Sequence, residues 1–363
     1  MSKSLPALFS PISFRQLELG NRIMVSPMCQ YSSVDGCVSD WHMMHLGQFS
    51  ISGAGLMFTE MTNVEARGRI SPHCVGLYSD DNEKALRKVV DFCTNYGDVP
   101  IGVQLAHAGR KASTGPPWEG RHYVPPEQGG WQPVGPSAIA ADETAHQPEA
   151  LSQAEVTVLI EAFASSAERA QRIGFDAIEL HAAHGYLLHQ FLSPVSNLRK
   201  DRYGGSVQNR MRFPLSVFES VRHVWPNDKP IGVRVSATDW IEGGWSLDDT
   251  VEFARKLKDL GCDWIDVSSG GISLHQDITS GPGYQVHLSR AVRQRAGIAT
   301  IAVGLITEAE HANSIIANGD ADIVALARGM LYNPRWPWHA ADRLGVDIGY
   351  PSQYLRCKPI SYQ

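Results

Sequence analysis

The sequence has no paired-cysteine motif, no long apolar run and no excess of basic residues. Its six cysteines are scattered along 363 residues without a C-x-x-C pair, which is typical of reduced thiols and argues against zinc or iron–sulfur sites. The net charge of −6 argues against nucleic-acid binding, because phosphate recognition usually needs a basic face. The N-terminus lacks a secretory apolar core, and no segment reaches about 18 consecutive apolar residues. We therefore expect a cytoplasmic protein that does not enter a membrane.

The composition is that of an ordinary globular enzyme, with 43% hydrophobic and 19% charged residues. Residues 8–20 are expected to form a hairpin that closes one end of the fold. Eight short apolar segments are predicted as strands: 22–28, 55–61, 101–106, 176–180, 230–236, 264–268, 300–304 and 322–328. Helical periodicity is found over 41–51, 82–96, from Ser152 onward, and over 208–224, 246–260, 286–296 and 307–318.

The alternation of strands with helices predicts a parallel sheet closed into a (β/α)8 TIM barrel, an α/β fold, as a single domain over residues 1–363. An open, doubly wound sheet is the alternative, which is disfavoured because no G-x-G-x-x-G follows the first strand. After the third strand the chain passes through a long loop over residues 107–150 that carries seven prolines. A loop of this length is expected to be a lid or a substrate-binding wall.

The stretch Asp176–Asn197 joins a predicted strand to three candidate functional side chains. His181, His184 and Tyr186 follow directly after the strand, at the barrel end where ligands bind. Two imidazoles and a phenol at this place can hold one oxygen and deliver one proton. The alternative is that the two histidines are hydrogen-bonded core or loop residues without a catalytic role.

Further polar side chains and glycines fall at the ends of the other strands. Arg328 with nearby Gly304 indicates a phosphate site, because barrel phosphates often bind beside the last two strands. Gln104 and Arg234 are expected on neighbouring inner positions, where they suit the edge of an amide-like ring. Alternatively, each of them pairs with a buried carboxylate inside the barrel. The remaining candidates at this end are Cys29, Tyr31, Met61 and residues 268–271.

Seven motifs along the chain resemble those of the Old Yellow Enzyme family, in particular its shorter bacterial subgroup that includes the xenobiotic reductases. They are SPMCQY at 26–31, QLAHAGRKA at 104–112, IELHAAHGYLLHQFLSPVSNLRKDRYGG at 178–205, VRVSATDW at 233–240, SSGG at 268–271, AVGLIT at 302–307 and ALARGML at 325–331. The resemblance covers essentially the whole chain, in order. It implies a barrel that binds FMN, accepts hydride from NADPH or NADH, and reduces activated C=C bonds of unsaturated ketones, aldehydes or maleimides. Nitro compounds are further candidate substrates.

The resemblance also implies individual roles around the cofactor. The residues implied beside the flavin ring are Ser26, Pro27, Met28, Cys29 and Met61. Gln104 and Arg234 would hold the pyrimidine edge of the ring. The residues implied at the phosphate are Gly304, Ala327 and Arg328.

On the substrate side, the resemblance implies that His181 and His184 hydrogen-bond the carbonyl oxygen and that Tyr186 protonates the α-carbon. Tyr31 would line the substrate pocket, and the Cys29 thiol would tune the flavin and substrate binding. Two positions depart from the family pattern, because Met61 replaces an alanine and Val303 replaces a tryptophan of some relatives.

The C-terminal tail over residues 345–363 resembles a segment that reaches the active site of a neighbouring subunit. Arg356 would be its finger, in a homodimer or homotetramer. The alternative is a solvated terminal arginine.

Two other functions fit parts of the pattern. One is a metal-dependent hydrolase on the same barrel with His181 and His184 as ligands, although no third ligand stands at suitable spacing. The other is a flavin-binding sensor without catalytic activity. The ene-reductase interpretation is preferred to both, and it implies no bound metal.

Overall fold

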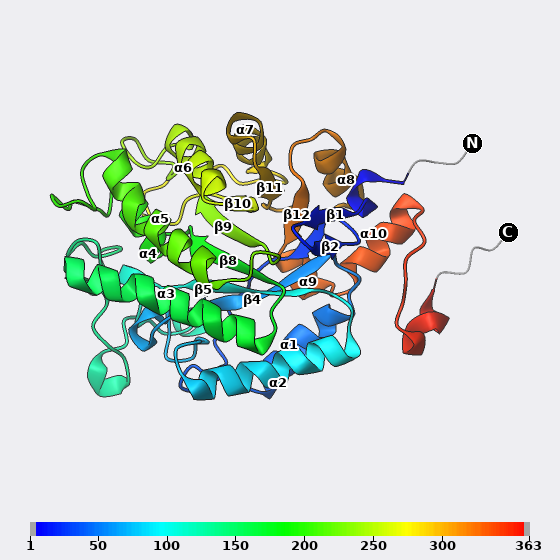
Figure 1. Cartoon of the computed structure of the whole chain (residues 1–363), viewed down its shortest axis with the longest axis horizontal. Coiled ribbons are helices and arrows are strands. Elements are labelled where there is room, and N and C mark those ends of the chain that lie inside the picture. The colour runs from blue at the N-terminus through cyan, green and yellow to red at the C-terminus, as the bar shows by residue number, and fades with distance from the viewer. Residues whose placement is uncertain (1–4, 359–363) are drawn as a thin grey trace.

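The computed structural model describes residues 5–358 and confirms the predicted barrel (Figure 1). Its eight parallel strands close on themselves in the order β10-β11-β12-β3-β4-β5-β8-β9. Their bounds are β3 (Ile23–Val25), β4 (Leu56–Asn63), β5 (Ile101–Ala106), β8 (Ala177–Ala182), β9 (Ile231–Ser236), β10 (Trp264–Ser268), β11 (Ala299–Ala302) and β12 (Ile323–Leu326). Both faces of such strands are buried, which explains their nearly continuous apolar sequences.

Three strands end earlier than the sequence predicted. The first strand ends at Val25 instead of residue 28, β11 ends at Ala302 instead of residue 304, and β12 ends at Leu326 instead of residue 328. In each case the chain leaves the barrel wall early, and the released residues lie at the barrel mouth: Ser26–Met28, Val303–Gly304 and Ala327–Arg328.

Helices surround the barrel. The main ones are α1 (Asp40–Ser50), α2 (Asp80–Tyr96), α3 (Gln153–Ile173), α5 (Val207–Val224), α6 (Leu247–Asp259), α7 (Val286–Ala296) and α8 (Ala309–Ala317). All seven were predicted, and the ends that the sequence analysis gave agree within two residues. The sequence did not indicate α4 (Leu187–Leu192), α9 (Arg328–Tyr332) and α10 (Trp336–Leu344). The first two are too short to show a helical period, whereas α10 is amphipathic and was missed.

Local capping explains why α3 begins and ends where it does. The Ser152 hydroxyl accepts a hydrogen bond from the Glu155 amide at 3.2 Å, and the Glu155 carboxylate accepts one from the Ser152 amide at 2.9 Å. Gly174 ends the helix with φ of 104°, a left-handed conformation that favours glycine. The same pair of hydrogen bonds, between Ser246 and Asp249, caps the start of α6.

The predicted hairpin closes the amino-terminal end of the barrel. Strands β1 (Ile12–Phe14) and β2 (Leu17–Leu19) pair antiparallel, and the Phe14 ring lies 5.1 Å from the Trp264 ring inside the barrel. Gly232 makes room for this indole, because a Cβ at that position would lie 1.9 Å from Trp264 Nε1. Aromatic side chains thus fill one end, and the carboxyl ends of the strands form the other.

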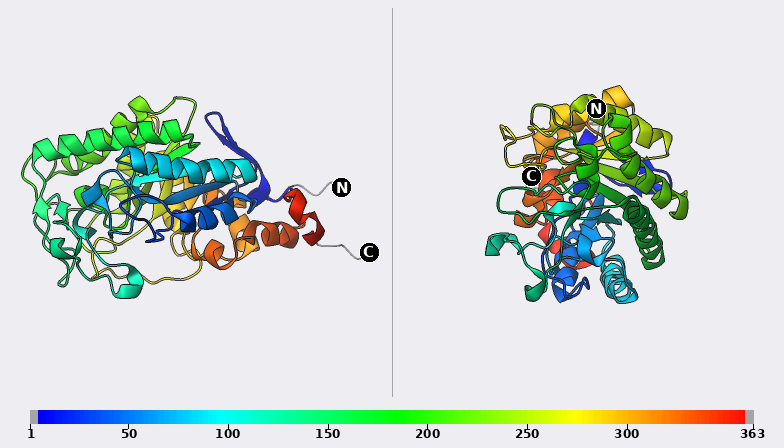
Figure 2. Two further views of the ribbon diagram at one scale, coloured as in Figure 1. Left: turned by 90° about the horizontal axis from the view of Figure 1, so that it is seen from below. Right: turned by 90° about the vertical axis from the view of Figure 1, so that its left-hand side faces the viewer.

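The long loop over residues 107–150 lies at the carboxyl end of the strands, whereas the C-terminal segment lies at the opposite end of the molecule (Figures 1 and 2). The long loop contains only short elements, including the paired strands β6 (Val134–Gly135) and β7 (Glu149–Ala150). Trp131 anchors the loop by donating a hydrogen bond from Nε1 to the Arg67 carbonyl at 2.7 Å. The loop therefore covers the barrel mouth, as expected of a lid or wall.

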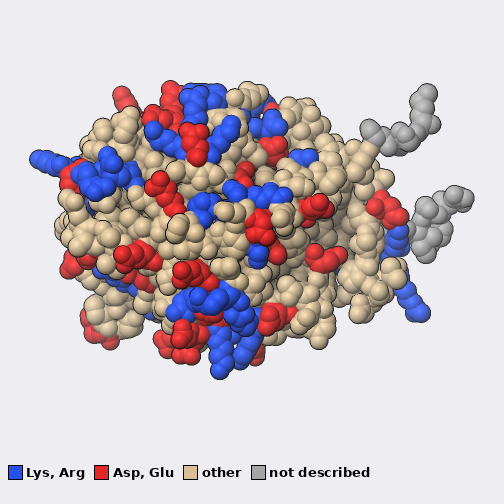
Figure 3. Space-filling model, in the orientation of Figure 1, with Lys and Arg blue, Asp and Glu red and all other residues tan. Residues whose placement is uncertain are grey.

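The surface shows no strong separation of charge on the face seen in Figure 3, where acidic and basic side chains are interspersed. Within residues 5–358, no helix combines the length and the hydropathy that crossing a membrane requires.

Candidate active site

His181, His184 and Tyr186 lie together at the carboxyl end of β8. The His181 ring centroid is 5.1 Å from that of His184 and 5.0 Å from that of Tyr186, with interplanar angles of 87° and 76°. His184 Nε2 also lies 2.7 Å from the hydroxyl of Ser268, at the end of β10. The three side chains therefore form one cluster at the barrel mouth, which the sequence alone indicated.

The turn that carries this cluster is held by contacts that the sequence did not indicate. His184 and Gly185 are left-handed, with φ of 58° and 72°, and a Cβ at Gly185 would lie 2.2 Å from the Gly271 carbonyl oxygen. The Gly185 amide donates to His189 Nδ1 at 2.8 Å, and His189 Nε2 lies 2.8 Å from Asp239 Oδ1. His189 and Asp239 are fully buried, and together they hold the turn in place through the Gly185 amide. The only sequence signal of this pair is a third histidine, five residues after the second.

The protonation states of the cluster suit hydrogen-bond donation. Burial, followed by the charge of Arg234, lowers the pKa of both His181 and His184, so both rings are neutral at pH 7. His181 Nδ1 accepts a hydrogen bond from the Ala183 amide at 3.3 Å, which assigns the ring proton to Nε2. Burial raises the pKa of Tyr186 well above its ordinary value, so the phenol keeps its proton.

Cys29, Tyr31 and Met61 form an apolar wall beside Tyr186. All four side chains belong to one cluster around the buried Ile70. Met61 is only 2% exposed, so it is part of the core and of the wall at once. Burial, followed by the Glu60 carboxylate, raises the pKa of the Cys29 thiol, which is therefore protonated at neutral pH.

A layer of polar side chains crosses the barrel interior below the mouth. Gln104 Nε2 donates a hydrogen bond to Glu179 Oε1 at 2.8 Å, and Arg234 Nε lies 3.2 Å from Asp266 Oδ2. Each of the two candidate residues thus pairs with a buried carboxylate, the alternative considered from the sequence. The prediction that Gln104 and Arg234 occupy neighbouring inner positions is wrong, because β8 lies between the two strands that carry them. Glu179 and Asp266 were not predicted, although both stand at alternate, inward positions of their strands.

One proton is retained among these buried groups. Burial, followed by the nearby Asp266 carboxylate, raises the pKa of Glu179 to about 8. A protonated Glu179 leaves one negative charge, on Asp266, opposite one positive charge, on Arg234. The layer is then neutral as a whole at pH 7.

The retained proton predicts a pH dependence of stability. A folded-state pKa of about 8 lies above the ordinary value of 4.5, so its contribution is complete below pH 4.5 and is lost as the pH rises toward about 8. Glu179→Gln removes this loss, so the variant gains stability relative to the parent more at pH 9 than at pH 5. Chemical denaturation at both pH values measures the difference, with exposed Glu161→Gln as the control. An equal difference at the two pH values would show that Glu179 is ionised.

Gly304, Ala327 and Arg328 lie at the ends of β11 and β12, which are neighbours in the barrel. Gly304 has φ of 131°, and a Cβ there would lie 3.0 Å from Gln285 Nε2. Val303 beside it contacts the apolar cluster of the barrel interior. The Arg328 side chain is exposed and forms no ion pair within residues 5–358, so it is available to an anion. The structure thus places the predicted phosphate residues at one edge of the mouth.

Buried polar atoms at the mouth fit a flavin. Ser26 Oγ is buried without a hydrogen-bond partner among the described residues, and Arg234 Nε contacts Asp266 as an ion pair without hydrogen-bond geometry. Ser26 directly follows β3 and Arg234 lies on β9, and these two strands stand on opposite sides of the eight-stranded ring. A polar ring bound at the mouth could give Ser26 Oγ the hydrogen-bond partner that a buried hydroxyl normally has. Pro27 and Met28 follow Ser26 and are half-buried beside the same opening.

Arg356 does not belong to this site of its own chain. It lies on the short helix η6 (Ser352–Cys357), at the end of the molecule opposite the barrel mouth (Figure 2, left). The neighbouring Tyr354 packs back on the chain, with its ring 5.9 Å from the Trp338 ring. The last five residues of the predicted tail, 359–363, lie outside the described residues.

A metal site is not found in this region. Across residues 5–358, no three His, Cys, Asp or Glu side chains are grouped so that they could hold a metal ion.

Comparisons with known proteins identify the family of the chain. Residues 7–346 match the NADH:flavin oxidoreductase / NADH oxidase family. The NADPH dehydrogenase of Geobacillus thermodenitrificans (strain NG80-2) is 44% identical over 351 residues, which are 96% of this chain and 98% of the relative. The NADPH dehydrogenase of Bacillus subtilis (strain 168) is 42% identical with the same coverage.

Solved structures show the same architecture. Morphinone reductase superposes with a TM-score of 0.79 at 29% identity, over 97% of this chain and 93% of the other. A morphinone reductase structure in complex with tetrahydroNAD superposes with a TM-score of 0.78 at 28% identity, over 96% and 93% of the two chains. The chain belongs to the NADH:flavin oxidoreductase / NADH oxidase family, the Old Yellow Enzyme family, and is an NAD(P)H-dependent FMN oxidoreductase.

Proposed function

We propose that this flavoprotein is an ene-reductase, which reduces activated C=C bonds of α,β-unsaturated ketones, aldehydes and maleimides. Nitro compounds are further candidate substrates, and NADPH is the proposed reductant, with NADH as the alternative. One observation carries the proposal: two neutral imidazoles and a protonated phenol converge at the barrel mouth. This set offers hydrogen bonds to a carbonyl oxygen together with a proton for a carbon atom.

The chain's own residues supply binding and proton transfer. His181 and His184 hold the substrate carbonyl oxygen and stabilise the negative charge that develops on it. Tyr186 gives its hydroxyl proton to the α-carbon as general acid. FMN, when bound, would supply a hydride derived from NAD(P)H, so that with the proton from Tyr186 the alkene would gain one hydride and one proton. The apolar wall that contains Tyr31 keeps water from the reacting carbon atoms.

We also propose the cofactor contacts. The residues that would face the ring are Ser26, Pro27, Met28, Cys29 and Met61. Gln104 and Arg234 would hold its pyrimidine edge, and both side chains are buried in the barrel interior. The residues that would hold the phosphate are Gly304, Ala327 and Arg328, of which exposed Arg328 supplies the charge.

A phenol titration tests the oxygen-binding role of the histidines. Phenolates resemble the enolate of the reaction, so phenol is expected to bind and to produce a long-wavelength absorption band with the flavin. Replacing both His181 and His184 by alanine should weaken phenol binding by about 10- to 100-fold for each hydrogen bond lost to the charged oxygen. The exposed His339→Ala serves as control. Unchanged affinity in the double variant would contradict the proposal.

The same protein preparation addresses the two alternatives. A metal-dependent hydrolase would carry one stoichiometric metal ion that His181→Ala removes, whereas the proposal expects none by elemental analysis. A flavin-binding sensor would be reduced by NADPH but would not turn over any alkene. A cytoplasmic location stays a prediction.

The position of the tail supports an oligomer with shared active sites. Because η6 lies at the end opposite the barrel mouth, Arg356 can reach only the site of another chain. Arg356 and Leu355 are exposed beside the anchored Tyr354. We therefore propose a homodimer or homotetramer in which Arg356 closes the partner's substrate pocket.

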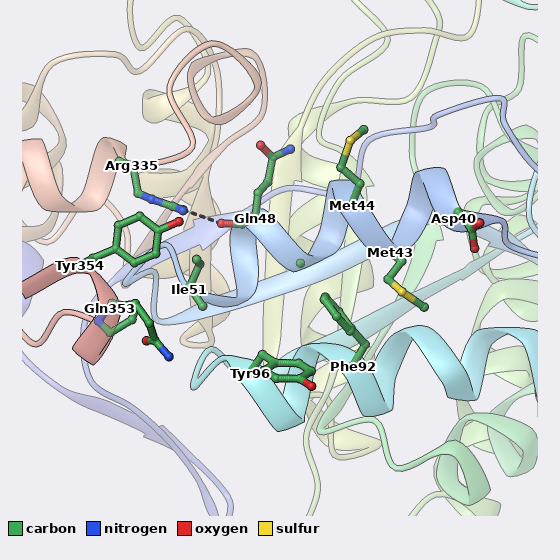
Figure 4. Close-up of a pocket in the computed structure, with 12 residues that line it drawn as sticks. Asp40, Met43, Met44, Gln48, Ile51, Phe92, Tyr96, Arg335, Gln353 and Tyr354 are labelled. Atoms are coloured by element: carbon green, nitrogen blue, oxygen red, sulfur yellow. Dashed lines mark hydrogen bonds between the residues drawn. The ribbon is translucent and has the colours of Figure 1, made fainter.

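A groove next to the tail fits this assembly (Figure 4). It has a volume of about 580 Å³ and lies between α1, α2 and the tail. Met44 and Tyr96 on its rim are 57% and 72% exposed. Arg335 holds the tail side of the groove by donating to the Gln48 carbonyl at 2.7 Å. Exposed apolar surface of this kind is typical of protein interfaces, and a second copy of the chain is the occupant that we propose.

Mixed dimers test the role of Arg356. Arg356→Ala is expected to raise the apparent KM for NADPH or enone without changing the FMN content. Combining an Arg356→Ala chain with a Tyr186→Phe chain then leaves one intact site and one site with both defects, so about half of the parent activity per dimer returns. Activity equal to the mean of the two single-variant homodimers would show that Arg356 acts within its own chain.

A further inference from the structure

A second cavity, of about 220 Å³, lies next to Tyr186 between the barrel mouth and the long loop. We call this cavity the vestibule. Its walls include three cations, Arg110, Lys111 and Arg121, and one carboxylate, Asp142. The proposed reaction uses none of these four side chains.

The three cations of the vestibule have no ion-pair partner within residues 5–358. The buried Arg110 donates to the carbonyl oxygens of Ala140 at 3.2 Å and Ile272 at 2.6 Å. Lys111 Nζ donates to the carbonyl oxygens of His184, at 2.8 Å, and Gly271. Backbone oxygens thus fix the position of both charges without neutralising them.

Arg121 completes the cation group from the loop. Its side chain is exposed and forms no hydrogen bond with other described residues, so it is free to turn toward a ligand. The single carboxylate of the vestibule, Asp142, supplies one negative charge against the three positive ones. The vestibule therefore has a local excess of positive charge in a chain whose net charge is −6.

Burial and the neighbouring positive charges both act on the Lys111 ammonium group. Burial, followed by the charges of Arg110 and Arg121, lowers the pKa of Lys111 to about 8. Buried charges are normally paired, and an unpaired group leaves its desolvation uncompensated. An anion in the vestibule would supply the missing counter-charge. Because Tyr186 also lines the cavity, that anion would stand beside the proposed proton donor.

We propose that the vestibule is a binding site for a carboxylate or phosphate group of the molecule whose reacting end lies at Tyr186. This inference rests on the proposed function, and it adds that the molecules that react at Tyr186 carry an anionic group. Two sources have this chemistry: an alkene that carries a carboxylate, and the phosphates of the nicotinamide nucleotide. Arg121 is the specificity residue, because it is the one cation of the three that no backbone oxygen holds.

The first arm of the test uses two phenols that do not react, phenol and 4-hydroxyphenylacetate, titrated against the FMN-loaded protein by flavin absorbance. The carboxylate is expected to tighten binding by about 10-fold or more, the usual effect of a hydrogen bond to a charged group. Arg121→Gln should abolish this gain, and its affinity for neutral phenol should stay within about twofold. Arg255→Gln, which removes an exposed arginine of α6, is the matched control.

The second arm compares NADPH with NADH by the concentration dependence of flavin reduction. If a nucleotide phosphate fills the vestibule, Arg121→Gln raises the half-saturating NADPH concentration by a similar factor, and the control variant does not. A loss in either arm supports the proposal and identifies the source of the anion. If neither arm responds to Arg121→Gln, the vestibule is not an anion site. If phenol itself does not bind, the histidine role in the proposed function fails, and the nucleotide arm alone decides the vestibule.

Discussion

Tyr186→Phe is expected to slow alkene reduction by about 100- to 10,000-fold, the usual cost of losing a general acid. The phenol hydroxyl is the proton donor in the proposed reaction, and phenylalanine keeps the ring that contacts His181. Burial raises the pKa of Tyr186, so the parent holds this proton throughout the neutral range. Rapid-mixing kinetics of the reduced flavoprotein with an enone measures the effect.

The Tyr186→Phe variant should still bind FMN and should still be reduced by NADPH at the parent rate. Tyr203→Phe, which removes the hydroxyl of a buried tyrosine elsewhere in the fold, is the matched control. If Tyr186→Phe reduces enones as fast as the parent, another group supplies the proton and the proposed role of the cluster is wrong.

Arg234→Met is expected to produce the largest structural effect of a single substitution at this site. It leaves the buried Asp266 carboxylate without its cation, and breaking a buried pair typically costs about 3–5 kcal/mol. It also removes the guanidinium proposed to hold the flavin's pyrimidine edge. We therefore expect a lower midpoint of chemical denaturation together with a lower FMN content after gel filtration.

A double variant separates these two effects of Arg234→Met. Adding Asp266→Asn removes the unpaired charge, so stability should largely return while the FMN content stays low. If the single variant retains FMN with the parent affinity, Arg234 does not contact the cofactor and only pairs with the Asp266 carboxylate.

Much of the fold could be predicted because the same pattern of a strand followed by a helix repeats along the chain. Each strand is a short apolar run, and each long helix has an apolar face and often a cap such as Ser152 with Glu155. The prediction failed where local sequence has no period. Helices α4 and α9 have six and five residues, which is too few for a helical period to be recognised.

The site could be predicted in part. His181, His184 and Tyr186 stand close together in sequence at one strand end, so their contact follows from the fold. Contacts between distant segments could not be predicted. Arg234 and Asp266 lie opposite each other on two neighbouring strands, and the register of these strands cannot be read from the sequence.

The cation group of the vestibule could not be predicted from the sequence for the same reason. Arg110 and Lys111 stand within a motif that the sequence analysis identified, whereas Arg121 comes from a loop without periodicity. Only the folded loop brings it to the same cavity.

Alkene reduction by the bound flavin is the central claim, and an anaerobic single-turnover experiment tests it most directly. The purified protein is bleached with one equivalent of NADPH, and 2-cyclohexenone is then added without oxygen. We predict that the yellow FMN absorbance returns in full and that one equivalent of cyclohexanone forms per flavin. If the flavin stays bleached and the enone is recovered unchanged, although oxygen restores the colour, the protein is not an ene-reductase for this class of alkene.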